Sequence, residues 1–240
     1  MDGKGGYSAG GNCMIKTLLW DVDGTLLDFV AAERYGMNKC LAEIGVTMTD
    51  EMLADYSAIN RSWWGKHEKG LATREEIFEG RLRDFFEKYN IAYTDYEHFN
   101  RQYQIALGEE VFPMDDCLTL LKELRKTYKQ YMVTNGSLVA QELKLAKSGI
   151  DQLADGVFIS EVVGVQKPEK AFFDHVQQAT GYLPEETLII GDSLTSDIKG
   201  GNNAGIMTCW YNRKGGAPYC EVFINYQISN LWELTKILSK

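Results

Sequence analysis

Two aspartates one residue apart, Asp21 and Asp23, stand at the end of a short apolar run over residues 15–20. If that run is a β-strand, side chains at i and i+2 point to the same side, so both carboxylates share a small volume. Two such charges are unfavourable together unless a cation neutralises them, or one is a nucleophile and the other exchanges protons beside it. Gly24 then allows the backbone to turn tightly over a ligand. The spacing predicts a reactive site, and an ordinary acidic turn is the alternative.

Two further polar groups follow later in the chain. Thr134 and Asn135 end an apolar, β-branched run, and a hydroxyl followed by the N–H groups of a turn suits a phosphate oxygen. Lys167 stands before Pro168, which favours an extended backbone at the lysine. A lysine fixed in this way supplies a point positive charge.

A second pair of carboxylates comes last. Asp192 ends the apolar run over residues 187–191, and Asp197 lies five residues further on. Singly, such residues are more often caps or solvated turns, and Asp197 would serve equally well as a cap for a helix over 198–204. Open parallel sheets bind ligands at the carboxyl ends of their strands, so all four signals are expected to converge on one edge.

The pattern around these residues predicts the elements that position them. From residue 111 onward strands and helices alternate, which predicts an α/β, Rossmann-like parallel sheet with helices on both faces. Strands are expected up to Thr134, near 157–160, up to Asp192 and at 207–211. Helices are expected at 115–126, 138–147, 169–180 and up to residue 204.

Residues 29–110 contain no convincing strand and predict an inserted all-helical domain. Helices are expected at 31–43, 50–64, 73–89 and 95–107. Thr49 and Thr73 have the form of N-caps, the latter with Glu76 three residues later as a capping box. The sheet domain is then made of residues 14–28 and 111–240. Residues 1–13, with five glycines, predict a flexible N-terminal extension.

The four motifs, in this order, resemble those of the haloacid dehalogenase (HAD) superfamily of phosphatases and phosphotransferases. The resemblance implies that Asp21 is the nucleophile that takes the phosphoryl group and that Asp23 is the general acid and base. It implies that Thr134 and Lys167 hold the phosphate, and that the helical insertion is a C1-type cap, a lid over the site. The metal ligands that it implies are Asp21, Asp23, Asp192 and Asp197.

Charge counting predicts the cofactor. Asp21, Asp192, Asp197 and a phosphate dianion bring about five negative charges, which Lys167 alone cannot balance. A hard divalent cation with oxygen ligands is required, and Mg²⁺ is the natural choice. An aspartyl phosphate would then split one difficult displacement into two easier ones.

The cap sequence resembles more narrowly the noncanonical pyrimidine 5′-nucleotidase branch of the superfamily. The resemblance lies in residues 55–64 and 208–212, and it implies pyrimidine nucleoside 5′-monophosphates as substrates. Asn60, Trp63 and Trp64 are the cap residues expected to face the substrate, with Thr134, Asn135 and Lys167 below. Nucleobases stack on aromatic side chains, although most cap aromatics at helical spacing should be core.

Other activities fit the same core. A phosphoglycolate or sugar-phosphate phosphatase, or a phosphomutase of the β-phosphoglucomutase type, would carry the same carboxylates. A 2-haloacid dehalogenase typically has a non-acidic residue where this chain has Asp23, and it needs no metal. A non-catalytic binding protein on this fold predicts the erosion of at least one motif, and all four are intact here.

Composition excludes several classes of partner. The net charge of −9 argues against nucleic-acid polymers and anionic membranes, and no apolar stretch approaches the length of a membrane span. Five scattered cysteines without a C-x-x-C pair predict reduced thiols and a cytoplasmic protein. The expected partner is a small-molecule phosphomonoester, and nothing in the sequence specifies an oligomeric state.

Overall fold

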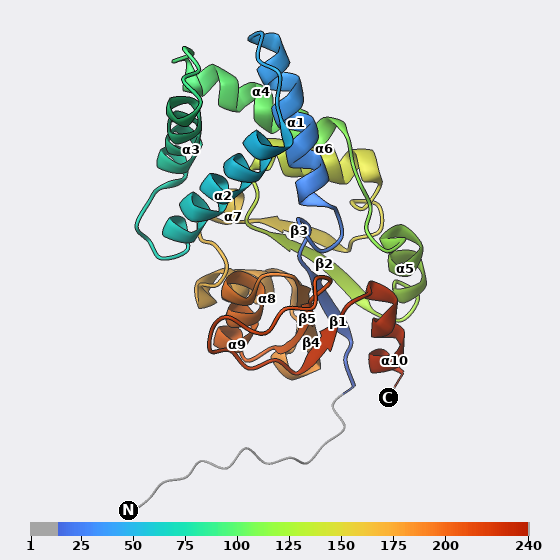
Figure 1. The fold of residues 1–240 in the computed structure, drawn as a ribbon. Helices are drawn as coiled ribbons and strands as arrows, with labels where there is room; N and C mark the ends of the chain where they lie inside the picture. Colours follow the sequence, from blue (N-terminus) through green and yellow to red (C-terminus); the bar gives the residue numbers. More distant parts are fainter. Residues whose placement is uncertain (1–13, 240) are drawn as a thin grey trace, which may run out of the picture.

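A computed structural model describes residues 14–239, so the predicted N-terminal extension over residues 1–13 lies outside the described residues. A single six-stranded parallel sheet has the strand order β3-β2-β1-β4-β5-β6 (Figure 1). The strands are β1 Thr17–Trp20, β2 Lys129–Thr134, β3 Gly156–Ile159, β4 Thr187–Gly191, β5 Met207–Tyr211 and β6 Tyr226–Ile228. The predicted α/β class is confirmed.

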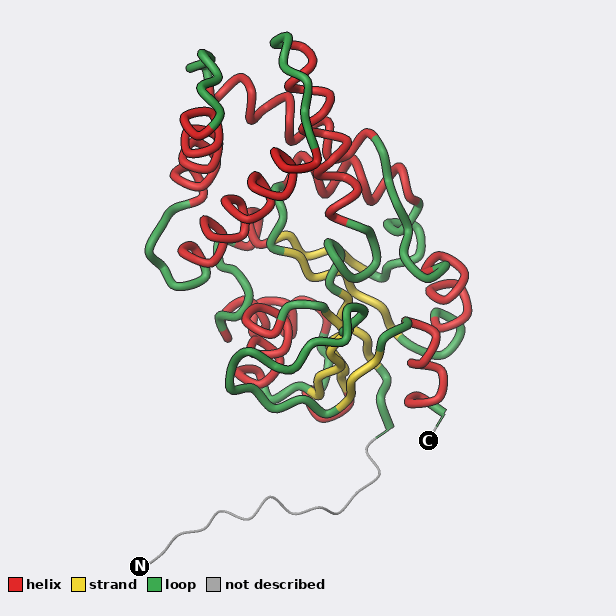
Figure 2. Tube along the Cα trace, viewed as in Figure 1, coloured by secondary structure: helices red, strands yellow, loops and turns green. Residues whose placement is uncertain are grey.

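Some helices pack around the sheet, and a further group of helices lies beyond one end of it (Figure 2). Those in the sheet domain are α5 Cys117–Leu124, α6 Leu138–Ser148, α7 Ser160–Val163, α8 Lys170–Thr180, α9 Lys199–Ala204 and α10 Leu234–Leu238. Shorter turns are η1 Pro184–Glu186, the π-helical η2 Leu194–Ile198 and η3 Leu231–Glu233. No helix of the described chain is long and apolar enough to cross a membrane.

The sheet has an apolar core on each face, as expected for parallel strands covered by helices. Leu18 and Trp20 of β1 belong to the core on one face, while Leu19 between them packs with Phe172 and Phe173 of α8 on the other. All three β1 residues are fully buried. Strand β1 is therefore packed on both faces, which fixes the position of the Asp21 carboxylate directly after it.

Two details of the sheet domain differ from the sequence prediction. The helix expected from residue 115 begins at Cys117, because Asp115 and Asp116 adopt positive φ angles of 48° and 52°. The Asp115 carboxylate instead accepts hydrogen bonds from Tyr211 Oη at 2.8 Å and Leu231 N at 3.0 Å. The structure also adds β6 and the C-terminal turns, which the sequence pattern did not predict.

The segment inserted after β1 consists of α1 Phe29–Glu43, α2 Asp50–His67, α3 Arg74–Lys88 and α4 Tyr96–Glu109. Thr73 forms the expected capping box with Glu76, and Thr49 caps α2. Tyr56, Phe85 and Tyr103 meet edge to face in the centre of this bundle. Most of the bundle's aromatic residues are therefore packing residues.

The helical bundle is docked onto the sheet domain rather than joined by its linkers alone. Gly108 of α4 lies so close to α6 that an added Cβ would come within 2.3 Å of Leu143. Arg74, the first residue of α3, donates to Ser160 Oγ at 2.9 Å and to the Asn135 carbonyl at 3.3 Å. The bundle thus forms a roof over the carboxyl edge of the sheet (Figure 1).

Candidate active site

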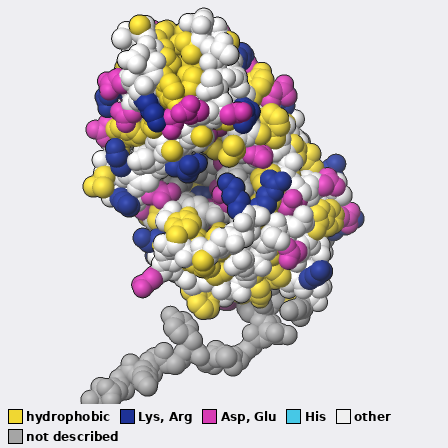
Figure 3. Space-filling view, viewed as in Figure 1, with side chains coloured by type: hydrophobic (Ala, Val, Ile, Leu, Met, Phe, Trp, Pro, Cys, Tyr) yellow, Lys and Arg dark blue, Asp and Glu magenta, His cyan; other side chains and the backbone are white. Residues whose placement is uncertain are grey.

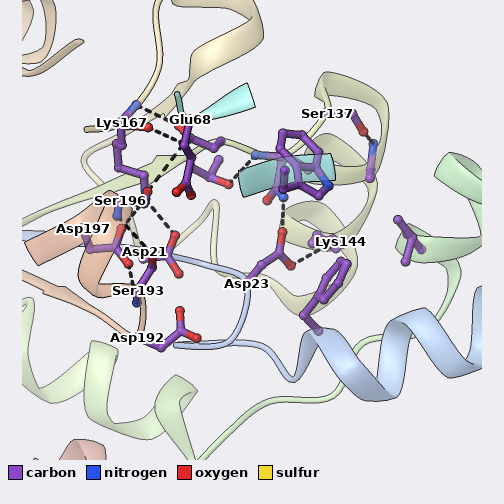
Figure 4. A pocket seen from close by; sticks show the side chains of 18 of the residues that line it. Asp21, Asp23, Glu68, Ser137, Lys144, Lys167, Asp192, Ser193, Ser196 and Asp197 are labelled. Carbon is purple, nitrogen blue, oxygen red and sulfur yellow. Dashed lines mark hydrogen bonds and ion pairs between the residues drawn. The ribbon is translucent and has the colours of Figure 1, made fainter. Parts of the chain in front are cut away.

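The floor of the candidate site is a buried charge cluster at the carboxyl edge of β1, β2 and β4. Lys167 Nζ donates to Asp21 Oδ1 at 2.8 Å, to Asp197 Oδ1 at 2.6 Å and to the Val133 carbonyl at 2.7 Å. Lys167 is 1% exposed and Asp21 is 7% exposed. Three residues separated widely in sequence thus meet around one ammonium group (Figure 4).

Burial and neighbouring charges shift the titration of this cluster. Burial, followed by the negative charge of Asp197, raises the pKa of Asp21 from 3.8 to about 7, although Lys167 opposes the rise. Burial alone would lower the pKa of Lys167, but the charges of Asp197 and Asp21 outweigh it and raise that pKa. Lys167 therefore stays a cation, while the Asp21 carboxyl holds a proton to a higher pH than an exposed aspartate does.

Asp192 completes the acidic cluster on its open side. Ligand oxygens of Asp21, Asp192 and Asp197 all lie within 4.8 Å of one another. Asp192 is exposed to the cavity, yet desolvation by the surrounding protein, then the charges of Asp21 and Asp197, raises its pKa well above its usual value. Gly24 makes the approach possible: its φ is +90°, and an added Cβ would lie 2.7 Å from Asp192 Oδ2.

The acidic cluster fits a divalent metal ion. Asp21 and Asp192 offer carboxylate oxygens to the cavity, which are the donors that Mg²⁺ prefers. Both oxygens of Asp21 and of Asp197 already accept hydrogen bonds, Asp21 Oδ2 from Thr25 Oγ1 at 3.0 Å and Asp197 Oδ2 from Ser193 N at 3.0 Å, whereas Asp192 is exposed. The Asp197 carboxylate therefore holds Lys167 and the turn after β4 in place.

Asp23 turns away from this cluster. Its Oδ1 accepts from Lys144 Nζ at 2.6 Å and its Oδ2 from Gln141 Nε2 at 2.6 Å (Figure 4). Among residues 14–239 the acidic side chains that converge are Asp21, Asp192 and Asp197. The geometry therefore does not support the expectation that the Asp23 carboxylate ligates the metal. Asp23 still lines the same cavity.

The loop after β2 serves two purposes. Thr134 is 1% exposed and lines the cavity, and its hydroxyl oxygen accepts from Gly136 N at 3.1 Å, which leaves its proton to donate. Asn135 lines the cavity too, and its side chain holds the backbone of Lys167 through Nδ2 to the carbonyl at 2.8 Å and Oδ1 from the amide at 3.0 Å. Asn135 thus positions Lys167.

Several cavity residues escaped the sequence analysis. The helical roof contributes side chains of mixed polarity, and α6 contributes two polar ones from below. The roof residues are Phe29, Trp64, Glu68, Arg81, Gln104 and Leu107, and those of α6 are Gln141 and Lys144. On the face seen in Figure 3, Lys and Arg side chains gather around the hollow between the two parts of the molecule. An anion entering there meets positive charge despite the net charge of the chain.

Of the three cap residues expected to face substrate, Trp64 alone lines this cavity. Trp63 points to another surface, where its Nε1 donates to Asp84 Oδ2 at 2.8 Å and Lys66 covers its ring. Asn60 is 2% exposed and lies in the interior of the bundle. The expectation for Trp63 and Asn60 is therefore not supported. Trp63 lies on another face of α2, whereas Asn60 lies one turn before Trp64 on the same face but is covered by its partners Glu33 and Arg81.

Asn60 instead belongs to a buried polar chain that links the roof to the floor. Its Nδ2 donates to Glu33 Oε1 at 3.0 Å, and its Oδ1 accepts from Arg81 at 2.9 Å. Arg81 also donates to Asn100 Oδ1 at 2.7 Å. The chain continues through Gln104, which bonds Asn100 at 3.2 Å and accepts from the Ser137 hydroxyl at 2.5 Å. Burial raises the pKa of Glu33.

The sequence matches a known protein family and characterised relatives. A profile described as haloacid dehalogenase-like hydrolase matches residues 15–205. The chain is 35% identical over 227 residues to the pyrimidine 5′-nucleotidase PynA of Streptococcus pneumoniae, covering 94% of this chain and 95% of that protein. It is 31% identical over 224 residues to the pyrimidine 5′-nucleotidase YjjG of Escherichia coli, covering 93% and 97%.

A solved structure resembles the whole described molecule. The putative HAD-hydrolase YfnB of Bacillus subtilis superposes with a TM-score of 0.89 at 36% sequence identity, covering 95% of this chain and all 100% of that one. That structure is described as bound to magnesium and as revealing interdomain movement.

Proposed function

This chain belongs to the haloacid dehalogenase-like hydrolases, and from that premise we propose that it is a Mg²⁺-dependent phosphomonoester hydrolase that prefers pyrimidine nucleoside 5′-monophosphates. The observation that carries the hydrolase chemistry is the buried lysine held between two aspartates, with a third aspartate open to the same cavity. A phosphate group placed there meets a nucleophile, a fixed cation and oxygen ligands for a metal at once.

In the first half of the proposed reaction, an oxygen of Asp21 attacks phosphorus. A bond forms between that oxygen and phosphorus while the bond to the leaving oxygen breaks. Asp23, protonated at this stage, gives its proton to the leaving oxygen, which departs as an alcohol. Lys167 and the Thr134 hydroxyl bind the phosphoryl oxygens, because both line the cavity beside Asp21.

In the second half, water attacks the phosphorus of the aspartyl phosphate. Asp23, now a carboxylate, takes the proton from that water, and the bond from phosphorus to Asp21 breaks. Inorganic phosphate leaves, and Asp21 returns as a carboxylate with Asp23 protonated again. The turn of Asp23 away from the acidic cluster suits this role, since it faces the cavity from a different side than Asp192.

Asp21 and Asp192 are the residues that would hold Mg²⁺, with Asp197 keeping Lys167 beside them. The bound ion supplies neutralisation of the phosphate charge and of the crowded carboxylates. The raised pKa of Asp21 and of Asp192 supports this assignment, because carboxylates crowded in this way gain most from a divalent cation.

The roof supports a flat leaving group that carries hydrogen-bond acceptors. Trp64 and Phe29 offer aromatic surface, and Leu107 adds an apolar wall. Arg81 lines the same cavity as a buried cation whose hydrogen-bond partners are the neutral amides of Asn60 and Asn100. A pyrimidine base, with a planar ring and carbonyl oxygens, matches this combination better than a small sugar does.

A comparison of substrates tests the proposal. With Mg²⁺, we expect kcat/KM for dUMP, UMP or dTMP to exceed that for 2-deoxyribose 5-phosphate, phosphoglycolate or a hexose phosphate by tenfold or more, about 1.4 kcal/mol. Product analysis should find inorganic phosphate and nucleoside, with no phosphate returned to a sugar as a mutase would do. A preference for phosphoglycolate or a hexose phosphate would leave the phosphatase assignment standing and remove the nucleotide one.

A further inference from the structure

Lys144 and Gln141 lie one turn apart on α6 and hold a single carboxylate between them. Lys144 Nζ donates to Asp23 Oδ1 and Gln141 Nε2 donates to Asp23 Oδ2, each at 2.6 Å. Lys144 is 2% exposed and Gln141 is fully buried, whereas the Asp23 side chain keeps 21% of its surface open. Both oxygens of Asp23 thus accept a hydrogen bond from α6, while the carboxylate still lines the cavity (Figure 4).

Burying Lys144 and Gln141 costs folding free energy, which indicates that they are present for a reason other than stability. Burying a lysine ammonium removes its hydration, and an apolar side chain there would cost less. The buried face of α6 otherwise carries Ala140 and Leu145, so two polar residues interrupt an apolar stripe. The Gln141 Oε1 atom is buried without a hydrogen-bond partner, a further cost that packing for stability alone would avoid.

The pair also lies where the helical bundle meets the sheet domain. The Lys144 ammonium is 5.8 Å from the ring centroid of Phe29, the first residue of α1. Ala140, on the same helix, packs into the apolar core of the bundle. The docked roof therefore covers the ammonium group and leaves Asp23 as the one carboxylate that it contacts among the described residues.

We propose that Lys144 and Gln141 are positioning residues that fix the Asp23 carboxylate for proton transfer. This inference rests on the proposed function, in which Asp23 gives a proton to the leaving oxygen and later takes one from water. Two N–H donors, one on each oxygen, fix the direction in which the Asp23 carboxylate faces the cavity. The pair therefore sets the geometry of both proton transfers, from Asp23 to the leaving oxygen and later from water to Asp23 as the phosphorus–Asp21 bond breaks.

A double-mutant cycle with Asp23→Asn tests this inference. We expect Lys144→Met to lower kcat by about tenfold or more with KM changed by less than about threefold, since orientation and not substrate binding is lost. With p-nitrophenyl phosphate, whose leaving group departs without needing a proton, the aspartyl phosphate should accumulate during turnover, because its hydrolysis is then the slowed step. In the Asp23→Asn background the same change should have little further effect, since the group that Lys144 positions is already disabled.

Lys147→Met is the matched control. Lys147 lies on the same helix and donates to the Glu109 carbonyl and to Glu110 Oε1 at the end of α4. The substitution therefore removes a lysine and a contact with the bundle without affecting the partners of Asp23. It should keep the wild-type kcat. Gln141→Met, which retains the lysine, repeats the cycle if Lys144→Met does not yield folded protein.

Three outcomes would overturn the inference, and they are distinguishable. If Lys144→Met lowers kcat equally in the wild-type and Asp23→Asn backgrounds, the lysine supports the fold and not Asp23. If Asp23→Asn loses activity while both Lys144→Met and Gln141→Met turn over at the wild-type rate, the positioning role alone is wrong. If Asp23→Asn itself keeps the wild-type kcat, the acid–base part of the proposed function fails and this inference with it.

Discussion

The floor and the roof of the cavity are built in different ways. On the floor, Asp21, Asp192 and Lys167 reach the cavity from strand ends and the loops beside them, and hydrogen bonds and ion pairs fix Asp21 and Lys167. On the roof, Trp64 and Arg81 project from helix faces into the same space. The residues of the floor determine the reaction at phosphorus, whereas the residues of the roof determine which leaving group fits. Changes to the floor should therefore affect all substrates, and changes to the roof should alter the ratios between them.

The largest effect is expected from Asp21→Asn. An amide is nearly isosteric with the carboxylate but cannot attack phosphorus, so kcat should fall by about a thousandfold or more for every phosphomonoester alike. Lys167 still pairs with Asp197, so the variant should fold and unfold at a similar temperature. Steady-state kinetics with a nucleotide and with p-nitrophenyl phosphate measure the effect. Retained turnover of either substrate would show that Asp21 is not the nucleophile.

A second prediction concerns pH and the metal ion. In the metal-free protein the pKa of Asp21 is raised from 3.8 to about 7, so its contribution favours folding at low pH and is lost as the pH rises through about 7. Mg²⁺ binds the ionised carboxylates, so it must displace a proton at about pH 5.5 but not at about pH 8. The increase in Tm on adding Mg²⁺ should therefore be larger at the higher pH.

Thermal unfolding with and without Mg²⁺ at the two pH values measures this difference. Asp21→Asn is the control, because it removes the titrating group and should reduce the dependence of the Mg²⁺ effect on pH. An equal rise in Tm at both pH values in the wild-type protein would contradict the assignment of Asp21 as a metal ligand.

The smallest effect is expected on the roof, from Trp64→Ala. Loss of a stacking surface should lower kcat/KM for a pyrimidine nucleotide relative to p-nitrophenyl phosphate by about 1 to 3 kcal/mol, roughly five- to a hundredfold. Trp63→Ala is the matched control, since its indole lies on another surface against Asp84 and Lys66. A ratio unchanged by Trp64→Ala, or changed equally by Trp63→Ala, would mean that the indole packs the bundle and does not contact the base.

Strand-end positions were predictable from sequence because topology determines them. Once the runs before Asp21, Thr134 and Asp192 form parallel strands, their ends must meet at one edge of the sheet. The bundle helices were predictable as elements too, since Thr49 and Thr73 supply caps that the structure confirms. The start of α5 was not, because Asp115 and Asp116 adopt positive φ angles and the Asp115 carboxylate accepts hydrogen bonds from the distant residues Tyr211 and Leu231.

Helix-face residues of the site were harder to predict because a small rotation about the helix axis exchanges one neighbour for the next. Trp63 and Trp64 are adjacent in sequence, yet only the second lines the cavity in the described structure. Gln141 and Lys144 did leave a signal, since they place polar groups on the apolar face of α6. What they hold depends on how α6 lies across the end of β1, which no local pattern specifies.

Asp21 is expected to carry a phosphoryl group during turnover, and mass spectrometry of acid-quenched enzyme tests this directly. We predict a phosphorylated peptide that contains Asp21 in the wild-type protein, more of it in Asp23→Asn, and none in Asp21→Asn. The increase in Asp23→Asn is expected with p-nitrophenyl phosphate, whose leaving group departs without needing a proton, because only the second step then loses the help of Asp23. Phosphorylation at another residue, or rapid turnover with no phosphorylated enzyme in Asp23→Asn, would contradict the account.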